Sequence, residues 1–128
     1  AIANGESKIT ETIFENRMSH VHLLNKMGAN IKLNKNIAHI KGVKKIKGMD
    51  LVGSDLRSSA ALIIAAILAK GTSKIYGLEH LDRGYENFES KLKILGIKIT
   101  REFNKKTLTN KEYKASSDPA DIPRYRVA

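Results

Sequence analysis

The sequence predicts an α/β fold built from a repeated unit, and three observations lead to that prediction. Strand-like and helix-like segments alternate along the chain, a glycine follows each helical segment, and the pattern recurs after 66 to 68 residues. Residues 3–9 match residues 69–75, and Asn16-Arg17 returns as Asp82-Arg83. Residues 26–31 match residues 94–99 after an insertion of two. The shared register indicates parts of two copies of one unit.

The first unit, residues 1–48, is predicted to be incomplete. Its expected elements are a strand at 8–13, a helix at 19–27, and a hairpin of 31–33 and 37–40 that turns at Asn34-Lys35-Asn36. Residues 1–5 match only the last turn of the long helix in the second unit and the glycine after it. We therefore expect the chain to be the C-terminal piece of a longer repeat protein.

The second unit, residues 49–103, contains the clearest helix of the chain. A short strand at 49–52 precedes Asp55, which is well suited to cap a helix at 56–70 because its side chain can accept free backbone N–H groups. Gly71 follows where a left-handed C-terminal cap is wanted. The helix is rich in alanine and apolar on nearly every side, so it is predicted to be buried.

The remaining elements follow in the same order as in the first unit. They are a strand at 73–76, a loop at 80–84, a helix at 85–95 with Phe88, Leu92 and Leu95 on one face, and a strand at 97–100. Residues 104–128 hold both prolines of the chain, few apolar residues and no periodicity. This tail is predicted to be a loose extension.

Composition narrows the class of protein. The chain of 128 residues has 41% apolar residues, enough for one packed core, and it has no cysteine. The absence of cysteine excludes a disulfide scaffold, a thiolate zinc site and a cysteine nucleophile within this chain. The longest apolar run, residues 60–69, is about half of a bilayer span, and no export leader opens the chain. We expect a soluble, cytoplasmic protein without a membrane partner.

The net charge of +10 indicates an anionic ligand. Most of the basic residues are lysines spread along every segment, whereas a nucleic-acid binder usually gathers them on one face or arm. We expect no nucleic-acid partner, although a small basic nucleic-acid-binding module remains the rival interpretation. Oligomeric state cannot be read from the pattern.

Two arginine motifs are candidates for binding an anion. Arg57 follows the capping Asp55 at a helix start, where a cation is unfavourable for the helix dipole and an anion binds readily. Arg83 lies in the predicted loop, and Arg17 occupies the matching place in the first unit. An arginine on a tight loop can bind a phosphate or carboxylate with two N–H groups. The plainer alternatives are a simple cap at Asp55 and a surface ion pair of Arg83 with Asp82 or Glu86.

The four histidines do not form a metal-binding pattern. His20 and His22 point to different faces of a helix, His39 lies in a strand and His80 in a loop, with no carboxylate spacing to match them. Glycine-rich phosphate loops and nucleophile elbows are also absent from the sequence. We expect neither a metal nor a cofactor.

Three long blocks of sequence are distinctive: residues 9–17 (Ile-Thr-Glu-Thr-Ile-Phe-Glu-Asn-Arg), residues 54–62 (Ser-Asp-Leu-Arg-Ser-Ser-Ala-Ala-Leu) and residues 80–86 (His-Leu-Asp-Arg-Gly-Tyr-Glu). Together they resemble the C-terminal region of the UDP-N-acetylglucosamine 1-carboxyvinyltransferase family. The match extends to about Arg101, and the tail beyond it has no recognisable counterpart. Met18-Ser19 and His22 depart from the usual family residues, which suggests a diverged copy or a truncated chain.

The resemblance implies an inside-out α/β barrel of strand-helix-strand-helix-strand-strand units, in an enzyme that transfers the enolpyruvyl group of phosphoenolpyruvate to the 3-hydroxyl of UDP-N-acetylglucosamine. In that family, Arg83 corresponds to an arginine that contacts phosphoenolpyruvate, and Asp55 to an aspartate near the reacting centre. Ile13 lies where the backbone meets the uridine nucleotide, while Arg17 and Arg57 support binding. The family's cysteine loop, its lysine and its general-base aspartate would precede this segment. A fragment alone is therefore expected to be inactive, and a non-catalytic remnant is a further alternative.

Overall fold

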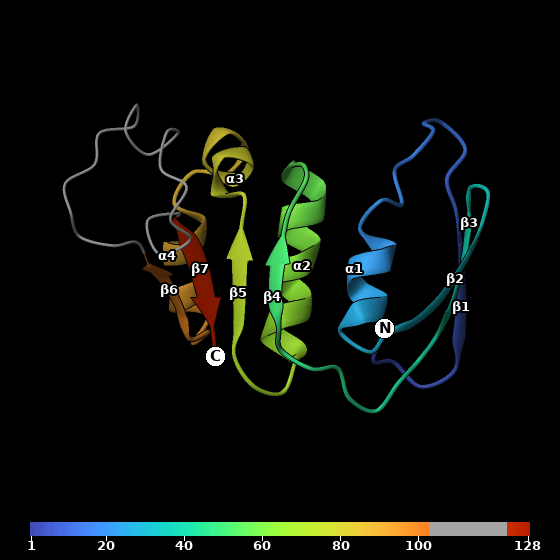
Figure 1. The fold of residues 1–128 in the computed structure, drawn as a ribbon, viewed down its shortest axis with the longest axis horizontal. Helices are drawn as coiled ribbons and strands as arrows, with labels where there is room; N and C mark the ends of the chain where they lie inside the picture. Colours follow the sequence, from blue (N-terminus) through green and yellow to red (C-terminus); the bar gives the residue numbers. More distant parts are fainter. Residues whose placement is uncertain (103–122) are drawn as a thin grey trace.

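The computed structural model describes residues 1–102 and 123–128, which form two β-sheets and four helices (Figure 1). In chain order the elements are β1 Glu6–Thr10, α1 Val21–Lys26, β2 Asn30–Asn34, β3 Ile37–Lys41, β4 Asp50–Val52, α2 Leu56–Leu68, β5 Ser73–Tyr76, α3 Leu78–Gly84, α4 Phe88–Ile94, β6 Ile99–Glu102 and β7 Arg124–Val127. Strands and helices alternate, as the sequence predicts for an α/β fold.

The two sheets repeat one topology. The first has the strand order β1-β3-β2, and the second has β4-β5-β7-β6, so that β5, β7 and β6 correspond to β1, β3 and β2. All pairs within these triplets are antiparallel, whereas β4 and β5 are parallel. Gly5 and Gly71, which share a place in the repeat, both have a positive φ, +100° and +94°. The same unit therefore occurs twice, and only the second has a long helix.

Helix α2 packs at the centre of the second unit. Leu62, Ile63 and Ala66 are fully or almost fully buried, and α1 lies between α2 and the three-stranded sheet (Figure 1). One face of α2 is nevertheless open, because Ile64 is 55% exposed and Leu68 is 49% exposed. The helix predicted at 56–70 is thus present and largely buried, but it ends at Leu68 and presents an apolar stripe to solvent.

Strand β7 differs most from the sequence prediction. The sequence predicts a loose tail, yet Arg124–Val127 pairs with β5 on one side and β6 on the other. Tyr125 and Val127 are buried in the main core beside Ile75 and Ile99. The prediction of a loose extension is therefore wrong for these residues, and for residues 104–122 it lies outside the described part of the chain.

Local contacts explain three smaller differences. The strand predicted at 8–13 is β1 at 6–10, because the Glu11 carboxylate binds the N–H groups of Ile13 and Phe14 and turns the chain. The predicted loop at 80–84 belongs to α3, whose Leu78 and Leu81 are buried one turn apart. The helix predicted at 85–95 is α4, which begins only at Phe88; its Leu95 neighbour is 75% exposed rather than buried.

Within residues 1–102 and 123–128, none of the helices combines the length and the hydropathy that a bilayer span needs.

Candidate active site

Three segments that the sequence singles out meet at one edge of the molecule. The carboxyl ends of the parallel strands β4 and β5 point to the upper edge of Figure 1, where α2 begins and α3 lies. The segment between β1 and α1 reaches the same edge (Figure 1). In α/β sheets this edge is where ligands bind, because helix starts and loops converge there.

The end of α3 packs on the first turn of α2. A Cβ added to Gly84 would lie 2.4 Å from Cδ2 of Leu56, so a larger residue at the end of α3 would displace the Leu56 side chain in the first turn of α2. Leu56 stands between Asp55 and Arg57, and Gly84 directly follows Arg83. The segments that carry the two motifs, 28 residues apart in the sequence, are therefore neighbours in the fold.

Asp55 caps α2, as its position in the sequence predicts. Its Oδ1 accepts hydrogen bonds from the backbone N of Arg57 at 2.9 Å and of Ser58 at 3.0 Å, and the Ser58 hydroxyl is in turn bound by the Asp55 N–H. The bond from the Ser58 N–H is the main reason that the pKa of Asp55 is lowered, helped by the Arg57 N–H and charge. The carboxylate is thus held anionic at the edge of the site.

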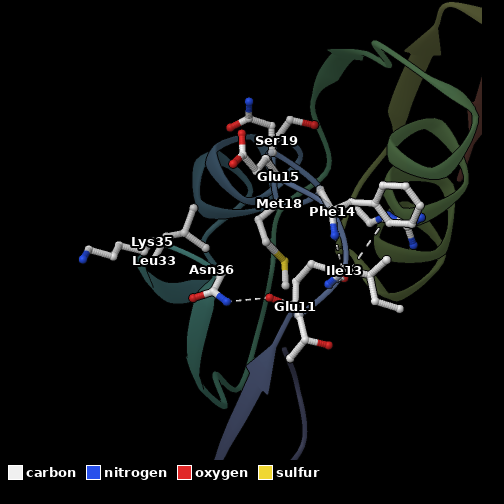
Figure 2. A pocket seen from close by; sticks show the side chains of 12 residues that line it. Glu11, Ile13, Phe14, Glu15, Met18, Ser19, Leu33, Lys35 and Asn36 are labelled. Atoms are coloured by element: carbon white, nitrogen blue, oxygen red, sulfur yellow. Dashed lines mark hydrogen bonds and ion pairs between the residues drawn. The ribbon is translucent and has the colours of Figure 1, made fainter.

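The segment 11–19 forms an open hollow of about 760 Å³ with the β2–β3 hairpin (Figure 2). Its lining residues include Ile13 of the segment and Leu33 and Asn36 of the hairpin. The Asn36 side chain donates a 2.6 Å hydrogen bond to the Glu11 carbonyl, which ties the segment to the hairpin. The Ile13 N–H is bound by Glu11 at 3.0 Å, while its side chain is 78% exposed. This hollow can accommodate a ligand of nucleotide size.

Arg17 lines the same hollow and is held in place by two neighbours. Its Nε lies 3.9 Å from Oε2 of Glu11, and its guanidinium stands 3.9 Å from the centre of the Phe14 ring. A cation over an aromatic face is attracted by the ring's negative quadrupole, so the orientation of Arg17 is restricted before any ligand binds.

Electrostatic effects connect the hollow with the start of α2. The pKa of Glu11 is lowered, first by the Ile13 N–H and then by other contacts that include the charges of Arg17 and Arg57. The pKa of His20 is lowered chiefly by burial, against an opposing effect of the Asp55 charge. Residues from both units therefore lie within electrostatic range of one another.

Arg83 lies in the last turn of α3 with an exposed side chain. Within the described residues it has neither of the ion pairs that the sequence suggested, because Asp82 binds Arg101 of β6 instead. Arg57 is also exposed, with its Nε 3.9 Å from Asp55. The structure thus gathers Ile13, Arg17, Asp55, Arg57 and Arg83 at one edge and leaves the Arg83 guanidinium open to a ligand.

Two members of this neighbourhood were missed by the sequence analysis. Glu11 belongs to a recognised block, but only the fold reveals that its carboxylate shapes the hollow. Arg101 lies 19 residues from Asp82, and no local pattern signals their pairing. Among residues 1–102 and 123–128 no group of three His, Asp or Glu side chains is arranged to hold a metal ion.

Comparisons with known proteins identify the family of the chain. The family model of EPSP synthase (3-phosphoshikimate 1-carboxyvinyltransferase) matches residues 1–92. A UDP-N-acetylglucosamine 1-carboxyvinyltransferase of Prochlorococcus marinus strain MIT 9301 is 90% identical over all 128 residues, and one of Campylobacter jejuni strain RM1221 is 59% identical over 99 residues. The chain spans only 28% and 24% of these two relatives.

A solved structure shows the same fold. The enolpyruvyl transferase NikO from Streptomyces tendae superposes with a TM-score of 0.67 at 29% identity, over 73% of this chain and 22% of that protein. The resemblance inferred from the three sequence blocks is confirmed, and so is the prediction that the chain forms part of the enolpyruvyl transferase fold. The chain belongs to the EPSP synthase family.

Proposed function

We propose that this chain forms part of the active site of an enzyme that transfers the enolpyruvyl group of phosphoenolpyruvate to the 3-hydroxyl of UDP-N-acetylglucosamine, a cytoplasmic step of peptidoglycan precursor synthesis. The observation that carries the proposal is 90% identity, over the whole chain, to a protein named for this activity. In the proposed enzyme, residues 1–48 and the unit that begins at residue 49 are successive repeats.

The substrates of this reaction suit the cluster of arginines. A C–O bond forms between the sugar oxygen and C2 of phosphoenolpyruvate, the bond from C2 to the phosphate oxygen breaks, and the hydroxyl proton balances the departing phosphate. Both substrates are anionic, and the chain carries a net charge of +10. Arg83 is proposed to bind phosphoenolpyruvate through a bidentate, charge-assisted contact, with Arg57 beside it.

The other residues are assigned by their positions. Asp55, held anionic by its helix cap, is proposed to lie near the reacting centre. The hollow is proposed to hold the uridine nucleotide, since the Ile13 N–H is occupied by Glu11 and the Ile13 carbonyl remains as an acceptor for the base. Arg17, fixed by Phe14 and Glu11, supports the nucleotide at the same wall.

The test is a hybrid enzyme in which this chain replaces the matching segment of the P. marinus MIT 9301 relative. Release of phosphate from phosphoenolpyruvate in the presence of UDP-N-acetylglucosamine is expected. Arg83→Ala in the hybrid enzyme should raise the KM for phosphoenolpyruvate about 10- to 100-fold, since a hydrogen bond to a charged group contributes about 1.5 to 3 kcal/mol.

Arg126→Ala is the matched control, because Arg126 is an exposed arginine that pairs with Glu102 away from the site. A hybrid enzyme without turnover would contradict the proposal. Duplex binding that weakens steeply with salt, together with no response to UDP-N-acetylglucosamine, would favour the nucleic-acid interpretation.

A further inference from the structure

A bidentate ion pair joins α3 to strand β6. Nη1 of Arg101 donates to Oδ1 of Asp82 at 2.9 Å, and Nη2 donates to Oδ2 at 2.6 Å. Asp82 directly precedes Arg83 in the last turn of α3. This fork-to-fork contact fixes both the position and the plane of the Asp82 carboxylate.

Tyr125 of β7, the cross-strand partner of Arg101, also contacts the arginine. Arg101 lies opposite Tyr125 of β7 in the register, on the same face of the sheet as the buried Ile99, and its guanidinium stands 5.9 Å from the centre of the Tyr125 ring. Tyr125 is 1% exposed, and its hydroxyl donates a hydrogen bond to the Glu89 carboxylate of α4. The contact chain from Asp82 through Arg101 and Tyr125 to Glu89 therefore connects α3, both C-terminal strands and α4.

Helix α3 requires such an anchor. It has only seven residues, and an isolated helix of that length is not stable in water. Leu78 and Leu81 hold its first turn in the core, whereas Arg83 and Gly84 at its end are exposed. In the last turn of α3, the Asp82 side chain forms an ion pair with Arg101 of β6. Fixing Asp82 fixes the rotation of the turn, and hence the direction of the adjacent Arg83.

We propose that Arg101 is a positioning residue that holds the last turn of α3 through Asp82 so that Arg83 is aimed at phosphoenolpyruvate. The inference rests on the proposed function, because it needs Arg83 to bind that substrate. Without the clamp the last turn samples more conformations, and binding of phosphoenolpyruvate must then restrict them. Loss of the clamp should therefore weaken the binding of phosphoenolpyruvate and leave binding at the nucleotide hollow unchanged.

The experiment compares Arg101→Gln with Arg126→Gln in the hybrid enzyme. Both arginines pair with an acidic side chain at the surface, but Arg126 binds Glu102 at 3.4 Å on the opposite face of the sheet and does not touch α3. Arg101→Gln should raise the KM for phosphoenolpyruvate about five-fold, in the range of one partly exposed charge pair. The KM for UDP-N-acetylglucosamine, kcat and the melting temperature should match the control. Arg101→Lys, which keeps the charge but loses the fork, should recover part of the effect.

A second pair of variants separates this inference from the proposed function. In an Arg83→Ala background, Arg101→Gln should have no further effect on the KM for phosphoenolpyruvate, since it acts through Arg83. An additional loss in that background, or equal effects on both substrates, would overturn the positioning role. If Arg83→Ala raises the KM and Arg101→Gln does not, the inference alone is wrong. If Arg83→Ala changes nothing, the proposed role of Arg83 is wrong as well. Should Arg101→Gln fold poorly, Asp82→Asn serves the same comparison with a side chain of equal size.

Discussion

Asp55 has a structural role that must be separated from any catalytic one. Its Oδ1 accepts hydrogen bonds from two backbone N–H groups at the start of α2. A substitution that removes the side chain therefore changes the helix as well as the charge. Asparagine can still accept at the cap but carries no charge, so the pair of variants distinguishes the two roles.

We predict that Asp55→Ala lowers the free energy of unfolding by about 1 kcal/mol, whereas Asp55→Asn lowers it by less. Since folding lowers the pKa of Asp55, its stabilising effect is present above the unfolded value and is lost as the pH falls through the folded one. Urea unfolding of the chain at pH 7 and pH 3 measures both effects. In the hybrid enzyme, Asp55→Asn should still impair turnover; full activity would leave Asp55 as a cap alone.

His20 is predicted to titrate below its ordinary value of 6.5, because burial disfavours the charged imidazolium more than Asp55 stabilises it. A histidine whose pKa is lowered by folding destabilises the fold as the pH drops below the unfolded value. Histidine ring signals followed by NMR between pH 8 and pH 5, as working limits around the reference value, give the pKa directly. A pKa of His20 above 6.5 would contradict the prediction.

At the scale of elements, helix α2 combines a buried side with an open apolar stripe. Ile64 and Leu68, one turn apart, are about half exposed although α2 is the central helix. Exposed apolar patches of this kind favour contact with another surface. The stripe lies on a helix whose opposite side is fully packed, so its side chains can be changed without opening the core.

We predict that the 128-residue chain self-associates through this stripe. Replacing Ile64 and Leu68 together by lysine should shift the weight-average mass toward the monomer, as measured by sedimentation velocity over a series of concentrations. Ile94→Lys is the control, since Ile94 is 84% exposed on α4. Equal association of the double variant and the unaltered chain would contradict the prediction. An effect of Ile94→Lys as large as that of the double variant would place the contact elsewhere.

Strand β7 contributes to stability out of proportion to its four residues. Tyr125 and Val127 fill the core between β5 and β6, and the Tyr125 hydroxyl is bound by Glu89. Tyr125→Ala should therefore lower the free energy of unfolding by about 3 to 5 kcal/mol, the range found for large aromatic side chains in cores. Arg126→Ala, one residue along the same strand, should change it by less than about 1 kcal/mol. Denaturant unfolding of the two variants compares them directly, and similar values would mean that β7 is not part of the core.

These elements also show where sequence patterns are informative. The start of α2 follows from Asp55, which is a local signal, whereas the helix ends at Leu68, three residues before Gly71, with the extended Ala69 as its C-cap. All five predicted site residues lie in blocks that a reader of the sequence can recognise. Strand β7 could not be predicted, because its neighbours β5 and β6 are about 50 and 25 residues away and its pairing depends on tertiary context. Arg101 was missed for the same reason. Helix α3 was missed because it has only seven residues, and its two buried leucines are too few to show a helical period.

At the scale of the whole molecule, both units contribute to the candidate site. Together they supply groups on only one side of the place where the reacting atoms would lie. The start of α2 and the end of α3 come from the second unit, and the hollow comes from the first. General acid–base chemistry needs positioned groups on both sides of the reacting atoms. This chain spans 28% of the P. marinus relative, so most of the residues of such an enzyme lie in the remaining part.

We predict that the isolated 128-residue chain binds its anionic substrates weakly and does not turn them over. Arg83 and Arg57 can form charge-assisted contacts with a phosphate or carboxylate, but binding alone does not lower a barrier unless contacts strengthen in the transition state. The hollow is open to solvent, and water weakens every electrostatic contact that it reaches. An assay of phosphate release should therefore find activity in the hybrid enzyme and none in the isolated chain at equal concentration. Turnover by the pure chain that disappears in Arg83→Ala would show that one side of the site is sufficient. Turnover that persists in Arg83→Ala would instead indicate a contaminating enzyme. An inactive hybrid enzyme purified in the same way would then show the same phosphate release.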